Sequence, residues 1–191
     1  MLKIWTIVPT CLPLIVRRCH LCASDRFRAS GKFRVNANHK LLDAWLLVLC
    51  AGCGDTAKLS LLERVNVRSV DPRLLDRLHG NDIVLTAELL QDPLVQHRNR
   101  VALDWTNAWR LDTSDPLDDG GVDAGDGSDP EVLDVSVRFG ARIPVRPVRL
   151  IADGCGLARA EIERLIEAGK LVAAVRLGGK ISSDFTFTLK R

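Results

Sequence analysis

The sequence has no tyrosine and a single methionine, and aromatic residues make up only 5% of its 191 residues. Leucine, valine and isoleucine must therefore fill any core. It also has no uncharged run of the ~18 to 20 apolar residues that a membrane-spanning helix needs. The apolar stretch 1–16 is interrupted by Pro9 and Pro13, and Arg17 and Arg18 follow it without a small-residue cleavage site. We expect a cytoplasmic protein with no membrane segment.

The motifs of the common active sites are missing too. The chain contains no G-x-S-x-G, P-loop, H-E-x-x-H or glycine-rich dinucleotide motif. Cys155 is an alternative, because the sequence places it in a turn over 153–156 near a helix start, where a thiol pKa falls and a reactive or redox-sensing cysteine could arise. A nucleophile also needs a base, and the sequence offers none nearby. We therefore expect a protein that is not an enzyme.

Charge is distributed unevenly along the chain. Residues 1–70 hold 11 Lys/Arg and 4 Asp/Glu, residues 71–131 hold 5 and 14, and residues 132–191 hold 11 and 6. Two basic segments on either side of an acidic one favour surfaces that bind polyanions such as RNA. The acidic part is then a spacer or an internal competitor for those surfaces.

Hydrophobic alternation predicts an antiparallel sheet in the first third of the chain. Residues 27–38 and 56–64 alternate between apolar and polar, whereas 41–50 is apolar on both faces apart from Asp43. The intervening 36–40 contains two asparagines, which suit a hairpin turn.

The rest of the chain is typical of short helices and a few strands. Aspartate–proline pairs and apolar spacing predict helices over 72–79, 83–91 and 93–102. Residues 112–131 contain eight acidic residues and no basic one, which predicts a flexible loop, and their spacing fails the calcium-loop pattern. Beyond them the sequence predicts a strand over 132–141, a helix that opens at Pro147 and a second helix over 158–168. Two further strands are predicted over 171–175 and 185–190.

These elements predict an α+β fold in four parts. The first part is a zinc-ribbon-like β domain over 1–70, and the second is a helical segment over 71–111. The acidic linker over 112–131 and a carboxy-terminal α/β module over 132–191 follow.

Two C-x-x-C units carry the most specific signal. Cys19 and Cys22 form the first, Cys50 and Cys53 form the second, and the predicted hairpin lies between them. Two knuckles at one end of a small sheet can hold one ion in a tetrahedron of sulfurs. A redox dithiol would need a C-x-x-C at the start of a helix after a strand, and neither pair lies there.

We therefore predict a structural metal ion, zinc or alternatively iron, at these four cysteines. Four thiolates leave no open position for water, so the ion stabilises the fold and does not catalyse. His20 and Cys11 lie close by in the sequence as spare ligands.

The chain resembles an uncharacterised bacterial family, domain of unknown function 1062. The resemblance rests on the two knuckles and on the runs 30–38 (SGKFRVNAN) and 98–105 (RNRVALDW). It covers most of the chain outside the acidic loop, implies a zinc-ribbon-bearing protein and implies no activity.

A second resemblance lies in 146–171, which is similar to the RNA-binding module of the fourth protein of the small ribosomal subunit. Arg159 matches an arginine that faces phosphates in that module, and Leu165, Ile166 and Gly169 match its core and helix-stop positions. Ala158 stands where the module has serine, and acidic residues dilute the helix charge. An ordinary amphipathic helix with solvated charges is the alternative explanation.

Together these features predict an adaptor that binds RNA or a ribonucleoprotein. The phosphate contacts expected in the carboxy-terminal module are Arg146, Arg159, Arg164 and Lys170. Lys32 and Arg34 share one face of the first predicted strand and could add contacts, although alternation of this kind also marks a plain solvent face. A protein–protein interaction module with another partner is the alternative function.

Overall fold

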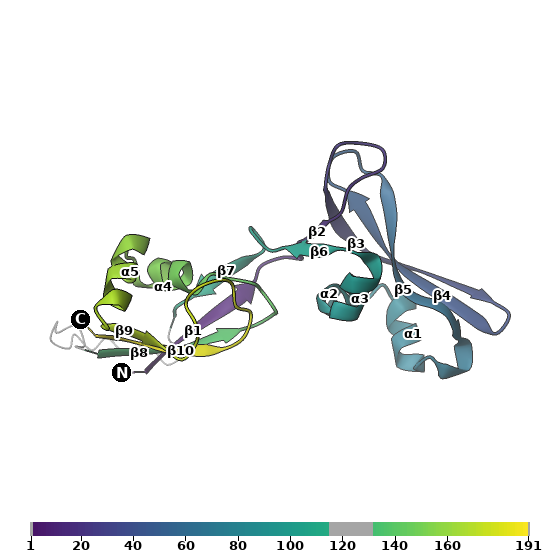
Figure 1. Ribbon diagram of the computed structural model, residues 1–191. Helices are drawn as coiled ribbons and strands as arrows, with labels where there is room; N and C mark the ends of the chain where they lie inside the picture. Colours follow the sequence, from purple (N-terminus) through teal and green to yellow (C-terminus); the bar gives the residue numbers. More distant parts are fainter. Residues whose placement is uncertain (1, 115–131, 191) are drawn as a thin grey trace. The chain divides into compact units, whose positions relative to one another are not determined.

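The computed structural model describes residues 2–114 and 132–190 (Figure 1). Contacts within the chain divide it into two compact units. One comprises Met1–Thr10 and Trp109–Arg191, and we call it the terminal unit; the other, Cys11–Ala108, is the insert unit. Each contains one five-stranded sheet, with helices beside it, so the predicted α+β class is confirmed.

The unit boundaries differ from the four parts predicted from the sequence. Strand β1 (Leu2–Pro9) belongs to the terminal unit, where it runs parallel to β8 (Val132–Phe139) and antiparallel to β7 (Trp109–Asp112). The segment predicted as a separate helical part joins the sheet of the insert unit. Pairing between strands so far apart in sequence leaves no local signal, which is why composition placed the boundaries elsewhere. Most of the predicted acidic loop, residues 115–131, lies outside the described residues.

The insert unit is built on an antiparallel sheet of strand order β5-β4-β3-β2-β6. The three predicted strands are confirmed as β3 Arg26–Asn38, β4 Leu41–Cys50 and β5 Thr56–Asn66. Two short strands that were not predicted, β2 Leu14–Val16 and β6 Ala102–Asp104, extend the sheet. The predicted turn joins β3 to β4, with His39 at a positive φ of 55°. A bulge between Ala29 and Phe33 shifts the β3–β4 register, and the inward alternation of β3 continues on both sides of it.

Three helices follow the short 3-10 turn η1 (Val67–Ser69) in this unit. They are α1 Pro72–His79, α2 Ile83–Gln91 and α3 Pro93–Asn99. The aspartate before each helix accepts backbone N–H bonds as its N-cap, which the sequence predicted for Asp71 and Asp92. Helix α3 ends earlier than predicted because Arg100 adopts the left-handed conformation and β6 begins at Ala102. Buried side chains of the helices and of β3–β5 form one core.

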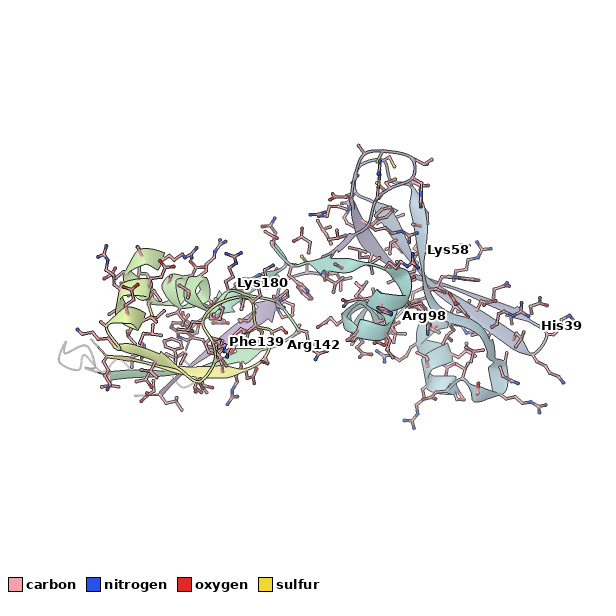
Figure 2. All side chains as sticks on the ribbon, in the orientation of Figure 1. His39, Lys58, Arg98, Phe139, Arg142 and Lys180 are labelled. Atoms are coloured by element: carbon pink, nitrogen blue, oxygen red, sulfur yellow. The ribbon has the colours of Figure 1, made fainter. Side chains whose placement is uncertain are left out.

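Side chains of α3 satisfy the open edge of β5. The Asn99 amide accepts from the Ser60 N–H at 2.6 Å and donates to the Ser60 carbonyl at 2.9 Å, as a neighbouring strand would. Arg98 donates to the Leu61 carbonyl at 2.6 Å (Figure 2). These bonds occupy backbone groups that would otherwise offer an edge for pairing with another chain.

The terminal unit has the strand order β7-β1-β8-β10-β9. Its remaining elements are α4 Pro147–Cys155, α5 Arg159–Glu167, β9 Leu171–Ala173 and β10 Phe185–Lys190. The predicted helices and strands of this part are confirmed within two residues, except that α4 continues through the predicted turn to Cys155. Trp5 packs edge-on against Phe187, with ring centres 5.3 Å apart, and lies directly under Gly154 of α4. The helices therefore cover the face of the sheet that carries Trp5.

No helix in the described parts of the chain combines the length and the apolar character that crossing a membrane requires.

Candidate metal centre and arginine pocket

Both C-x-x-C units lie at the same end of the insert-unit sheet. Cys19 and Cys22 are in the loop between β2 and β3, Cys50 is the last residue of β4, and Cys53 lies in the turn before β5. Because β3 and β4 form a hairpin, the chain returns to its starting end after the first knuckle and places the second beside it. The long spacing between the pairs is the length of that hairpin.

The four sulfurs fit one tetrahedral ion. All four Sγ atoms lie within 4.8 Å of one another. Cys19 Sγ is 3.8 Å from Cys53 Sγ, and Cys22 Sγ is 3.5 Å from Cys50 Sγ. Zinc–sulfur bonds of about 2.3 Å in a regular tetrahedron place the sulfurs about 3.8 Å apart. The four cysteines could therefore hold a metal ion with little rearrangement.

Backbone bonds hold the knuckles in place. The Cys19 N–H donates to the Ser24 carbonyl at 2.9 Å, and the Ala51 N–H donates to the Arg26 carbonyl at 2.8 Å, which ties the second knuckle to β3. Gly52 is required by space: an added Cβ would lie 3.0 Å from the Ser24 Cβ and 3.3 Å from Cys22 Sγ. These contacts fix the positions of the two knuckles relative to β3.

The surroundings of the cluster favour the thiolate form of Cys50 and the protonated form of Cys53. Backbone N–H bonds, first from Cys53 and then from Gly52, lower the pKa of the Cys50 thiol to about 6. At Cys53 the N–H of Asp55 favours the thiolate, but burial and the neighbouring thiols outweigh it and raise the pKa to about 12. The Leu21 N–H lies 3.4 Å from Cys19 Sγ and adds another donor to sulfur. An arriving cation would displace the remaining protons from the cluster.

The two spare ligands suggested by the sequence take no part in the cluster. His20 and Cys11 are exposed, and the Cys11 Sγ lies 4.0 Å from the Asn107 carbonyl. In the described residues the four cysteines are the one grouping of metal-ligating side chains close enough to share an ion. An ion held by all four sulfurs would have no position left for a reactive water.

A second feature, in the terminal unit, is a pocket of about 560 Å³ that we call the arginine pocket. Its polar lining includes Arg146, Arg149, Arg159 and Glu163, and Gly178 and Gly179 of the β9–β10 connection line it too. The fold therefore brings together Arg146 and Arg159, two of the residues proposed from the sequence. Arg149 was missed, although its position three residues after Arg146 on a proline-opened helix is a usable signal.

The other proposed phosphate contacts do not line this pocket. Arg164 and Lys170 are exposed, on the last turn of α5 and just after it. Lys32 and Arg34 are exposed on β3 of the insert unit. The structure therefore distributes the six residues over more than one surface.

The sheet face that carries Arg34 has a further cation beside an aromatic ring. Arg34 lies opposite Trp45 of β4, and the Lys58 ammonium lies 4.9 Å from the centre of the Trp45 ring (Figure 2). Sequence reasoning missed this pair, because it forms across two strands.

Cys155 is not the activated thiol that the sequence suggested. It is the last residue of α4, so it lies at the helix end whose dipole disfavours a thiolate. It is half-buried, and burial raises the pKa of its thiol. The prediction of a lowered pKa near a helix start was wrong, because Asp153-Gly154 continues the helix instead of forming a turn.

Comparison with known proteins identifies one matching family. The family model described as "Protein of unknown function (DUF1062)" matches residues 35–177, about three quarters of the chain. The match includes the second knuckle, α3, α4 and α5. No curated protein and no solved structure matches the chain. Because the match extends over most of the chain and includes elements of both units, the chain belongs to the DUF1062 family.

Proposed function

We propose that this protein is a non-enzymatic adaptor that binds RNA, alone or within a ribonucleoprotein, and that a structural zinc ion at Cys19, Cys22, Cys50 and Cys53 stabilises its insert unit. The observation that supports RNA binding is the arginine pocket. Phosphate oxygens are the ligands that guanidinium groups bind best, because two N–H groups match two oxygens.

Zinc is proposed over iron because a closed set of four thiolates suits a purely structural ion without redox chemistry. Elemental analysis of the purified protein should give one zinc per chain. If the purified protein is red and contains iron, the proposed ion is iron and not zinc, and the structural role of the site still holds.

RNA binding is tested by retention of RNA over a salt series. Binding should weaken steeply with salt, because each neutralised phosphate contributes about −0.7 to the slope of log K against log salt for a single strand. The double variant Arg146→Glu/Arg159→Glu should bind less tightly and with a slope smaller by about one to two.

Arg138→Glu is the control for reversing one charge outside the pocket. Arg138 is exposed on β8, where Val135 and Val137 point toward the buried face and Arg138 lies on the opposite one. It should reduce binding much less than the pocket double variant. If no RNA is retained at low salt, the RNA-binding function is rejected; salt-tolerant capture of one polypeptide would then favour a protein–protein interaction module.

A further inference from the structure

The arginine pocket has the shape and charge to take one phosphate group at the end of a chain. It is a concavity of about 560 Å³, which is within the size range of small-molecule sites. A backbone phosphate inside a strand has nucleotides on both sides and binds most readily along an open surface. A terminal phosphate has a covalent neighbour on one side only and can enter a pocket.

The charge of the lining points to a dianion. Three arginines and one glutamate give the pocket a net charge of +2. Arg159 is paired with Glu163 at 2.9 Å, and Arg149 lies 3.8 Å from Asp153, yet these side chains are at least 47% exposed, so both pairs are easily exchanged for a ligand. Arg146 has no ion-pair partner among the described residues. A phosphomonoester carries close to two negative charges at pH 7, whereas an internal diester carries one.

Residues from the first turns of two helices contribute to the lining of the pocket. The N-caps of α4 and α5 are Arg146 and Ala158, and neither makes a side-chain cap bond. By contrast, the aspartates before α1, α2 and α3 occupy the corresponding backbone N–H groups. Val148, Arg149 and Arg159, which lie in the first turns of α4 and α5, line the pocket. Their position adds the partial positive charge of two helix N-termini to that of the arginines.

The glycines of the lining leave room for the group. An added Cβ at Gly178 or Gly179 would meet no atom within 4 Å, so the space beside these residues is empty.

From these observations we propose that the arginine pocket binds a terminal phosphomonoester, and that in RNA it recognises the 5′-phosphate end. This inference rests on the proposed RNA-binding function for its ligand source. The same chemistry could come from a free mononucleotide, and the two sources are separated below.

The test compares two RNA oligonucleotides of one sequence, one with a 5′-phosphate and one with a 5′-hydroxyl, by fluorescence anisotropy at fixed salt. We expect the full-length protein to bind the phosphorylated RNA about tenfold more tightly, as one or two charge-assisted hydrogen bonds would give. In Arg146→Gln/Arg149→Gln the preference should fall below about twofold, while Arg138→Gln should keep it. Both pocket arginines are exposed, so these changes leave the core intact.

A second arm measures adenosine 5′-monophosphate against adenosine by calorimetry. If the monophosphate alone binds, and the arginine double variant abolishes it while no RNA binds, the phosphomonoester site stands and the RNA-binding function falls. If RNA binds but its two forms bind equally, the proposed function stands and the terminal-phosphate inference is overturned. Survival of the preference in Arg146→Gln/Arg149→Gln would overturn it as well.

Discussion

Replacing Cys50 by serine should uncouple the insert unit from its metal ion. Cys50 is only 1% exposed, accepts two backbone N–H bonds and lies 3.5 Å from Cys22 Sγ, so it is central to the cluster. A serine hydroxyl is shorter than a thiol and is not a thiolate ligand. The variant should therefore retain well under one ion per chain, where the unaltered protein retains one.

The size of the effect follows from the number of ligands. Structural zinc contributes about 10 to 16 kcal/mol of apparent binding energy at pH 7 in zinc-finger peptides. An even share over four ligands gives roughly 3 to 4 kcal/mol for the loss of one. For a unit of about 100 residues, each kcal/mol shifts the melting temperature by about 4 to 8 °C, so we expect a fall of about 10 to 30 °C.

Metal analysis, thermal unfolding and amide hydrogen exchange measure this directly. Exchange should accelerate first in the knuckles and at the adjoining ends of β3 and β4, and it should change less in β10, which lies in the terminal unit. Cys11→Ser is the control, because Cys11 is exposed and outside the cluster. Equal metal content in Cys50→Ser and Cys11→Ser, or equal melting temperatures, would refute the four-sulfur site.

Two further substitutions test the packing of each unit by thermal denaturation. Gly154→Ala should destabilise the terminal unit by about 1 to 3 kcal/mol, because the new Cβ would overlap the Trp5 ring, whereas Gly178→Ala adds a Cβ in empty space and should change little. A stable Gly154→Ala would contradict the close contact of α4 with the sheet. Asn99→Ala should cost the insert unit about 2 kcal/mol, because the Ser60 N–H and carbonyl lose their partners. A cost near zero would show that water replaces the amide.

Local patterns were sufficient to predict most elements. Alternation predicted β3 and β5, and an apolar run predicted β4 between them. The aspartate–proline pairs predicted the starts of α1 and α3, because a cap and a fixed proline φ act within a few residues. The four cysteines were predictable as a set for the same reason: C-x-x-C geometry is local, and one hairpin brings the two pairs together.

The sheet of the terminal unit was not predictable from such patterns. Strand β1 finds its partners in β7 and β8, more than 90 residues later in the chain, and the apolar sequence of β1 gives no indication of which strands those are. The arginine pocket was only half predicted, for a similar reason. Arg149 becomes a pocket residue only because the β9–β10 connection, with Gly178, returns to the helix starts.

The topology links the metal centre to the terminal unit through chain entropy. The chain leaves β1 at Pro9 and returns at Trp109, and these two residues are directly opposite each other in the β1–β7 pair. When the insert unit is folded, it already brings together the two ends of the roughly 100-residue segment between β1 and β7, before these strands pair. If loss of the ion unfolds it, pairing of β1 with β7 must close that loop itself, at an entropic cost of about 4 kcal/mol. Strand β1 supplies Trp5, on which α4 rests, and the arginine pocket begins at the first turn of α4. If the four cysteines hold a structural ion, as proposed, that ion would favour, through β1, the packed arrangement of the helices that form the pocket in the terminal unit.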